Sequence, residues 1–190
     1  MGYSLTAFEP MNENVYVIRK NLCLNPTINA IVFKKALGDS KKECKIYSGD
    51  INFSDGTVIC DGQAPAPILS YRYNFTITML DDYASYMKNI AAIKMDVEGN
   101  EYKVLRGGKK VFFDQPVPFF QIEFTRDDIK TFGDDPSEFL REFDRAGYHI
   151  RYPARRGYLT AEQIANVTFL PIIIDLYFIH SSIASAIPEL

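Results

Sequence analysis

Apolar positions along the chain alternate between strand-like and helix-like patterns. Short runs rich in β-branched and aromatic residues predict strands at 3–8, 28–34, 91–96, 118–124, 148–152 and 174–179. Apolar residues spaced three or four apart predict intervening helices at 12–24, 80–88, 98–111, 135–147 and 159–166. This alternation is typical of an α/β domain in which helices cover both faces of a mostly parallel sheet.

Residues 40–73 interrupt this alternation with a turn-rich segment. The dipeptides Asp55-Gly56 and Asp61-Gly62 mark turns within it. Short runs at 45–48 and 73–79 predict paired strands that frame the segment, which we expect to form a lid or a substrate rim. No linker or internal repeat is visible, and 190 residues suit one domain.

Composition and charge narrow the possible partners. A hydrophobic share of 47% supports a packed core and excludes a disordered chain. A net charge of −3 gives no broad positive surface for nucleic acid or an anionic membrane. The apolar run at 169–180 is interrupted by Pro171 and Asp175, so it predicts a buried strand rather than a membrane span. The N-terminus shows no signal-peptide pattern, and the compartment stays unknown.

The cysteines and histidines predict neither a disulfide nor a metal site. Cys23, Cys44 and Cys60 are odd in number and form no C-x-x-C motif, so we expect reduced thiols. His149 and His180 have no other ligand residue at metal-binding spacing, which argues against zinc.

Carboxylates follow strand after strand, at the edge where α/β sheets bind ligands. They are Glu9, Asp39, Asp96, Glu98 and Glu123. Such a set suits a ligand that carries hydroxyls and a positive charge. A carboxylate at the position of Glu9 either accepts hydrogen bonds from a ribose diol or favours the start of the next helix.

The segment from Asp96 to Glu101 is the densest acidic cluster. A carboxylate here could orient a cation, bind a metal or take a proton from a hydroxyl. The alternative is that Asp96 or Glu98 caps the following helix.

Several motifs together resemble the FkbM family of S-adenosylmethionine-dependent methyltransferases. In chain order they are Thr6-Ala-Phe-Glu-Pro10, Lys35-Ala-Leu-Gly-Asp39, Met79-Leu-Asp-Asp82, Ile93-Lys-Met-Asp-Val-Glu-Gly-Asn-Glu101, Val104-Leu-Arg-Gly107 and Gln121-Ile-Glu123. The resemblance implies a Rossmann-like class I methyltransferase domain over residues 1–152. Residues 153–190 would add a helix and the last strand of the same domain.

The resemblance also implies roles for individual residues in an O-methyl transfer. Glu9 would bind the ribose of S-adenosylmethionine, with Pro10 nearby. The backbone of Ala36, Leu37 and Gly38 would meet the adenine, together with Asp39.

For the acceptor side of the reaction, Asp96 would lie near the sulfonium, with Glu98 and Glu123 toward the methyl acceptor. Asp96 or Glu98 would act as the base that removes the hydroxyl proton. No resident metal is expected, although a metal-assisted role for Asp96 stays open. The acceptor would be a small molecule or a carbohydrate.

One family motif has no counterpart. The family begins with a strand and a glycine-rich loop that wraps the methionine end of the cofactor, and nothing like it precedes Tyr3. In the class I strand order 3-2-1-4-5-7-6, that first strand is the central one. We therefore expect the chain to be an N-terminally truncated part of a longer protein.

Two other functions compete with an active O-methyltransferase. A catalytically inactive fragment with a binding or structural role would explain the absent glycine-rich loop. A nicotinamide-dependent dehydrogenase would explain Glu9, but its G-x-G-x-x-G fingerprint is absent and it does not explain Asp96 to Gly107.

Overall fold

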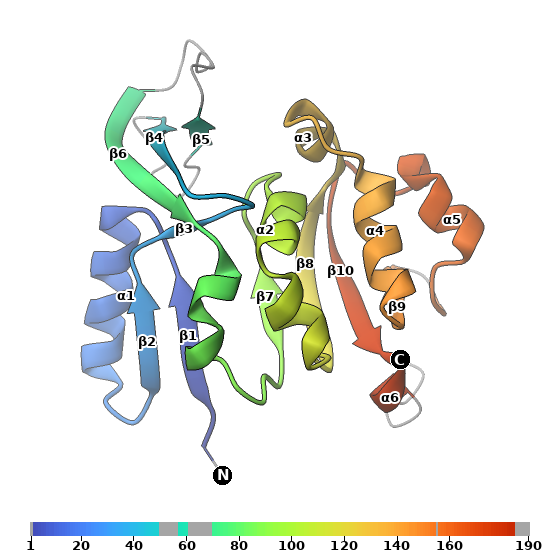
Figure 1. Cartoon of the computed structure of the whole chain (residues 1–190), viewed down its shortest axis with the longest axis horizontal. Coiled ribbons are helices and arrows are strands. Elements are labelled where there is room, and N and C mark those ends of the chain that lie inside the picture. The colour runs from blue at the N-terminus through green and yellow to red at the C-terminus, as the bar shows by residue number, and fades with distance from the viewer. Residues whose placement is uncertain (1, 50–56, 61–69, 155, 185–190) are drawn as a thin grey trace. The chain divides into compact units, whose positions relative to one another are not determined.

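The computed structural model divides into two compact units, Met1–Met87 and Lys88–Leu190. It describes residues 2–49, 57–60, 70–154 and 156–184. Each unit is an α/β arrangement with its own sheets, as Figure 1 shows.

The first unit opens with a parallel β-α-β motif. β1 (Ser4–Phe8) pairs in parallel with β2 (Asn29–Phe33), and α1 (Asn12–Leu24) connects them. Pro26 lies just beyond α1, and a proline disfavours helical backbone at the residue before it, which helps to end the helix. The rings of Phe8 and Phe33 stack at 5.2 Å between centroids. This motif brings the carboxyl ends of β1 and β2 side by side.

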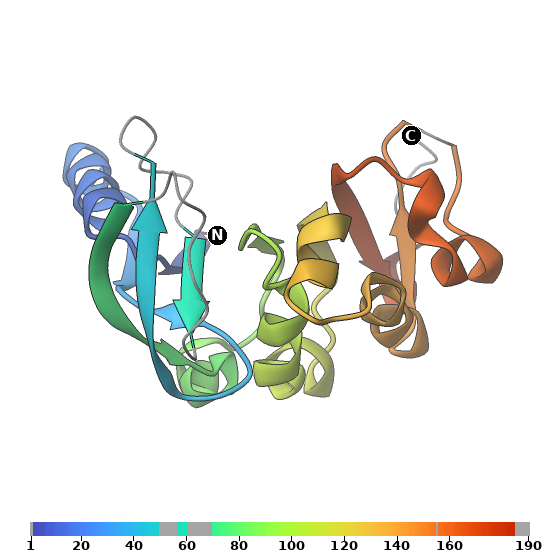
Figure 2. The ribbon, with the colours of Figure 1, turned by 90° about the horizontal axis from the view of Figure 1, so that it is seen from above.

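A second sheet in the first unit has the strand order β3-β6-β4-β5. Its strands are β3 (Ala36–Leu37), β6 (Ser70–Thr78), β4 (Lys42–Ser48) and β5 (Thr57–Cys60). β4 is antiparallel to both neighbours, and Figure 2 shows β4, β5 and β6 lying side by side. This sheet confirms that short strands pair across the turn-rich segment. The short 3₁₀ helix η1 (Leu80–Tyr86) follows β6.

The prediction of reduced thiols is wrong for two cysteines. Cys44 and Cys60 form a disulfide, and Cys23 is the free, exposed cysteine. The antiparallel register of β4 and β5 places Cys44 directly opposite Cys60, with 4.5 Å between their Cα atoms. An odd number of cysteines means that at least one thiol has no partner within the chain. It does not exclude a disulfide between the other two cysteines.

The second unit contains one sheet with the strand order β7-β8-β10-β9. Its strands are β7 (Ile93–Met95), β8 (Phe119–Thr125), β10 (Ile173–His180) and β9 (Tyr148–Arg151). The helical segments are α2 (Glu101–Gly107), η2 (Lys110–Asp114), α3 (Arg126–Thr131), α4 (Pro136–Arg145), α5 (Ala161–Ala165), η3 (Val167–Phe169) and α6 (Ser181–Ala184).

α4 covers one face of this sheet with an aromatic core. It begins at Pro136, where the Asp135 side chain accepts a hydrogen bond from the Ser137 N–H at 2.8 Å. Phe143 of α4 is fully buried and contacts Phe120 of β8 and Phe178 of β10. Burial of such large rings stabilises this unit.

The sheets are mixed rather than mostly parallel. β10 runs antiparallel to both β8 and β9, while β7 and β8 are parallel. The expected helical layer on a second face is also absent from the part of this sheet that the structure describes. The face opposite the aromatic core carries the half-buried polar residues Gln121, Glu123 and Asp175.

Within the described ranges, no helix has the length and apolar character needed to cross a membrane.

Candidate functional site

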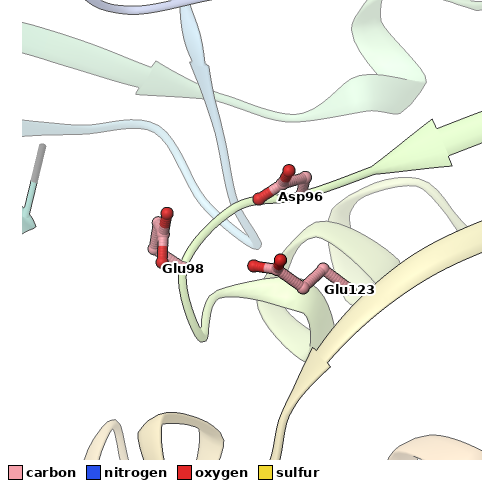
Figure 3. A group of neighbouring side chains, drawn as sticks. All are labelled: Asp96, Glu98 and Glu123. Carbon is pink, nitrogen blue, oxygen red and sulfur yellow. The ribbon is translucent and has the colours of Figure 1, made fainter. Parts of the chain in front are cut away.

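Three of the candidate carboxylates converge in the second unit. Asp96 directly follows β7, Glu98 lies in the next turn, and Glu123 projects from β8. One carboxylate oxygen of each residue lies within 4.8 Å of those of the other two, as Figure 3 shows. The convergence arises because β7 and β8 are parallel neighbours, so that their carboxyl ends meet at one edge of the sheet.

Lys94 places a positive charge next to this cluster. The ammonium of Lys94 lies 2.7 Å from Asp96 Oδ2, and this contact raises the pKa of Lys94. The pKa of Glu123 is raised, first by partial burial and then by the neighbouring charge of Asp96. The site is therefore negatively charged overall and holds a proton on Glu123 more strongly than an isolated carboxyl group would.

The cluster has the chemistry to bind a cation. Oxygen ligands in this number suit a hard divalent metal ion, and negative charge also favours an organic cation. Asp96 and Glu98 are exposed, and exposed acidic groups often gather without any ion.

The turn after β7 differs from the helix start expected at residue 98. α2 begins at Glu101, preceded by Asn100, whose side chain makes no capping hydrogen bond. Glu98 has φ +51° and Gly99 has φ +89°, so both lie in the left-handed region. A helix cannot include these conformations, which places Glu98 in a turn rather than in α2.

Glu101 lies fully buried next to this turn. Its Oε1 accepts a hydrogen bond from the Gly99 N–H at 3.1 Å, and burial raises the pKa of its carboxyl to about 7. Sequence patterns indicate Glu101 only as an acidic residue in a first helical turn, where side chains are normally exposed. Its burial could not be predicted.

Glu9 occupies the turn between β1 and α1 in the first unit. Its Oε1 accepts a hydrogen bond from the Met11 N–H at 2.7 Å, just before α1. One carboxylate oxygen thus has the helix-start role that the sequence left open. The Glu9 N–H donates to the Phe33 carbonyl at 3.1 Å, which places Glu9 beside the end of β2.

The segment Ala36–Asp39 follows the end of β2. Ala36 and Leu37 form β3, and the Gly38 N–H donates to the Thr78 carbonyl of β6 at 3.0 Å. A Cβ on Gly38 would lie 2.8 Å from the Ile77 side chain, so a larger residue would force that side chain to shift. The segment is therefore held against β6.

Tyr73 is a residue near Glu9 that sequence reasoning missed. Its hydroxyl donates to the Pro10 carbonyl at 3.1 Å and accepts from the Asn12 N–H at 2.5 Å. Tyr73 lies on β6, so it ties the turn that contains Glu9 to the second sheet of this unit. No local sequence signal marks a contact between residues 61 positions apart.

The expected substrate rim is only partly described. Residues 50–56 and 61–69 lie outside the described residues, so the prediction stands untested there.

Comparisons with known proteins identify the family. A profile of the methyltransferase FkbM domain matches residues 2–150. The crystal structure of methyltransferase FkbM from Methylobacillus flagellatus KT is similar in fold, with a TM-score of 0.50 and 14% sequence identity. That similarity covers 92% of this chain and 36% of the other chain. A search of curated proteins finds no match.

The architecture and this match define the class as methyltransferase-like. The chain belongs to the FkbM methyltransferase family. It spans about a third of the length of the solved structure that it resembles.

Proposed function

We propose that the chain forms part of an S-adenosylmethionine-dependent O-methyltransferase that acts on a hydroxyl of a small molecule or a sugar. The observation that carries the proposal is the convergence of Asp96, Glu98 and Glu123 at the end of β7 and β8 in a chain of this family. When bound, S-adenosylmethionine supplies a methyl group on a positively charged sulfur.

The strand orders support the class I form of this fold. The pair β2-β1 and the order β7-β8-β10-β9 each correspond to a run of the class I order, 3-2 and 4-5-7-6. Under this proposal, the antiparallel β10 corresponds to strand 7 of that order.

Within each unit, taken separately, the residues present suit a part of this cofactor in charge and hydrogen bonding. Glu9 binds the ribose hydroxyls through its carboxylate, of which one oxygen is already oriented by the Met11 N–H. Pro10 lies beside Glu9. The segment Ala36–Asp39 contacts the adenine of the cofactor. The negative charge at Asp96 and Glu98 attracts and orients the cationic end of the cofactor.

The acidic cluster also serves the acceptor. Asp96 or Glu98 accepts the proton of the attacking hydroxyl, because both are exposed carboxylates. Glu123 has a raised pKa and donates a hydrogen bond to a neighbouring oxygen when it is protonated.

Calorimetric titration with S-adenosylmethionine and S-adenosylhomocysteine tests cofactor binding. Glu9→Gln should lower the affinity by about tenfold or more, since hydrogen bonds to a charged group contribute about 1.5–3 kcal/mol. Glu13→Gln, in the exposed first turn of α1, is the matched control and should leave the affinity unchanged. An equal affinity of the Glu9 variant and the control would refute this role of Glu9.

Methyl transfer is tested separately with a radiolabelled methyl group and a panel of hydroxyl-bearing sugars and small molecules. The titrations and the transfer assay should be repeated on a version extended with upstream coding sequence. Cofactor binding without transfer in both versions would favour the alternative of a non-catalytic binding role. Absence of binding in both would refute the proposed function.

A further inference from the structure

The buried carboxyl of Glu101 lies near the acidic cluster, and the proposed chemistry does not use it. Its side chain is fully buried at the start of α2, and its Oε1 accepts the Gly99 N–H. Its Oε2 has no hydrogen-bond partner among the described residues. A buried carboxyl group with an unpaired oxygen lowers the stability of the folded state. Its presence here therefore indicates a structural or functional role.

The turn that Glu101 contacts has an unfavourable backbone. Glu98 adopts φ +51° although it carries a side chain, and such residues pay a conformational cost in this region. Gly99, with φ +89°, packs so tightly against α3 that an added Cβ would lie 2.6 Å from the Asp128 Cβ. The strained turn is therefore fixed by packing against α3 and by the hydrogen bond to Glu101.

We propose that Glu101 is a positioning residue: by holding the Gly99 N–H, its carboxyl fixes the turn that presents Asp96 and Glu98 to Glu123. The positioning of the cluster for a cationic cofactor rests on the proposed function. The role of Glu101 in fixing the turn does not, because it follows from the hydrogen bond that its carboxyl accepts from the Gly99 N–H.

The ionisation of Glu101 is coupled to the charge of the cluster. Burial raises its pKa to about 7, backbone hydrogen bonding lowers it, and the negative charge of Glu98 raises it further. Asp128 on α3 and Lys103 on α2 are further charged groups at the turn, and the Lys103 ammonium lies 3.4 Å from Asn100 Oδ1. A cation bound at Asp96 and Glu98 offsets the repulsion between Glu98 and Glu101, so it favours the ionised form of Glu101.

By thermodynamic linkage, ionised Glu101 in turn favours the bound cation. Ionisation also strengthens the bond from the Gly99 N–H, because hydrogen bonds to a charged acceptor are stronger. A cation that lowers the pKa of Glu101 by about one unit would raise its own affinity by up to about tenfold as the pH rises through 7.

The first experiment follows the Gly99 amide of the full chain by nuclear magnetic resonance from pH 5.5 to 8.5. Its chemical shift should titrate with a midpoint near 7, and Glu101→Gln should abolish this titration. Glu162→Gln, an exposed position on α5, is the matched control and should titrate like the wild type. A wild-type Gly99 amide that does not titrate, or one that still titrates in the Glu101 variant, would overturn the proposal.

The second experiment measures the side-chain carboxyl pKa of Glu123 in the same variants. Glu101→Ala is added here, because a glutamine can still accept the Gly99 N–H whereas an alanine cannot. If Glu101 fixes the turn, Glu101→Ala should let Asp96 move, and the contribution of Asp96 to the raised pKa of Glu123 should decrease. An unchanged pKa of Glu123 would show that the cluster keeps its geometry without Glu101 and would contradict the positioning role.

The third experiment measures the affinity for S-adenosylmethionine at pH 6 and pH 8. The wild-type affinity should increase by up to about tenfold, whereas the Glu101→Gln profile should be flat. Identical profiles would overturn the coupling. If neither the wild type nor the extended version binds the cofactor at any pH, the proposed function fails, while the Gly99 and Glu123 titrations still decide whether Glu101 holds the turn. If the variant does not fold, the wild-type Gly99 titration and affinity profile decide.

Discussion

Gly99 and Gly133 share a left-handed backbone but differ in their surroundings. Gly99 has φ +89° and an added Cβ would lie 2.6 Å from the Asp128 Cβ, whereas Gly133 has φ +85° and no neighbouring atom within 4 Å of that position. Gly133→Ala should therefore lower the free energy of unfolding by about 1–2 kcal/mol, which is the cost of placing a residue with a Cβ in the left-handed region. Gly99→Ala should cost about 1–3 kcal/mol more, because α3 must also shift. Urea unfolding measures both, and an equal loss would show that α3 yields without cost.

Glu101 should give the stability of the protein a specific pH dependence. Its pKa is about 7 in the folded protein, against 4.5 in the unfolded chain. Between these values the folded state keeps a proton that the unfolded state has released, so the contribution of Glu101 to stability falls as the pH rises. The total change is about 3 kcal/mol.

Glu101→Gln removes this dependence. The free energy of unfolding of the variant minus that of the wild type should therefore increase by up to about 3 kcal/mol between pH 4.5 and pH 8. Urea unfolding at several pH values measures the difference, with Glu162→Gln as the control. A constant difference would show that the carboxyl of Glu101 titrates as it does in the unfolded chain.

At the scale of single residues, the sequence predicted the exposed carboxylates of the candidate site better than the buried carboxyl group. The convergence of Asp96 and Glu123 followed from their positions at the ends of predicted strands. Lys94 could also have been predicted, because it lies two residues before Asp96 and hence on the same face of the strand. The burial of Glu101 depends on packing around a left-handed turn, which no local pattern specifies.

The β4–β5 pair illustrates how one covalent bond can hold an element in place. In the described part of the chain, β5 is a short edge strand that pairs only with β4, and the Cys44–Cys60 disulfide joins the two. With a sequence separation of 16 residues, loss of the bond should lower the free energy of unfolding by about 3 kcal/mol on the chain-entropy estimate.

Cys60→Ser tests this contribution, with Cys23→Ser at an exposed free cysteine as the control. Thermal unfolding should show a loss in the first variant and almost none in the second. Thiol titration of the denatured, unreduced wild type should detect Cys23 alone. Detection of three thiols would show that the disulfide does not form.

The elements themselves were mostly predictable, and the errors have physical causes. Helices were expected to cover both faces of the sheet, but in β8 the half-buried Gln121 and Glu123 alternate with the buried Phe120 and Ile122. That period of two is typical of a strand with one polar face, as the structure confirms. The helix α3 was missed because its six residues are too few to show a period.

For the whole molecule, the described cores of the two units differ in character. The second unit buries a continuous set of aromatic rings between α4 and the central strands β8 and β10. A core cluster in the first unit consists of the small to medium side chains Ala36, Cys44 and Ile77, with Phe75 packed against it. Because apolar burial is the main stabilising term, the second unit should be the more stable of the two.

Hydrogen–deuterium exchange measured by mass spectrometry should reveal this difference. The backbone amides of β8 and β10 should exchange slowest, since both strands pair on two sides and β8 alternates fully buried side chains. β1 should exchange faster, because within the described residues it pairs only with β2, and Leu5 in it is 50% exposed. Saturating S-adenosylmethionine should slow exchange at the end of β1 next to Glu9, if the proposed role of Glu9 holds. Amides of β1 that are as protected as those of β8 without any ligand would contradict the unequal stability of the units.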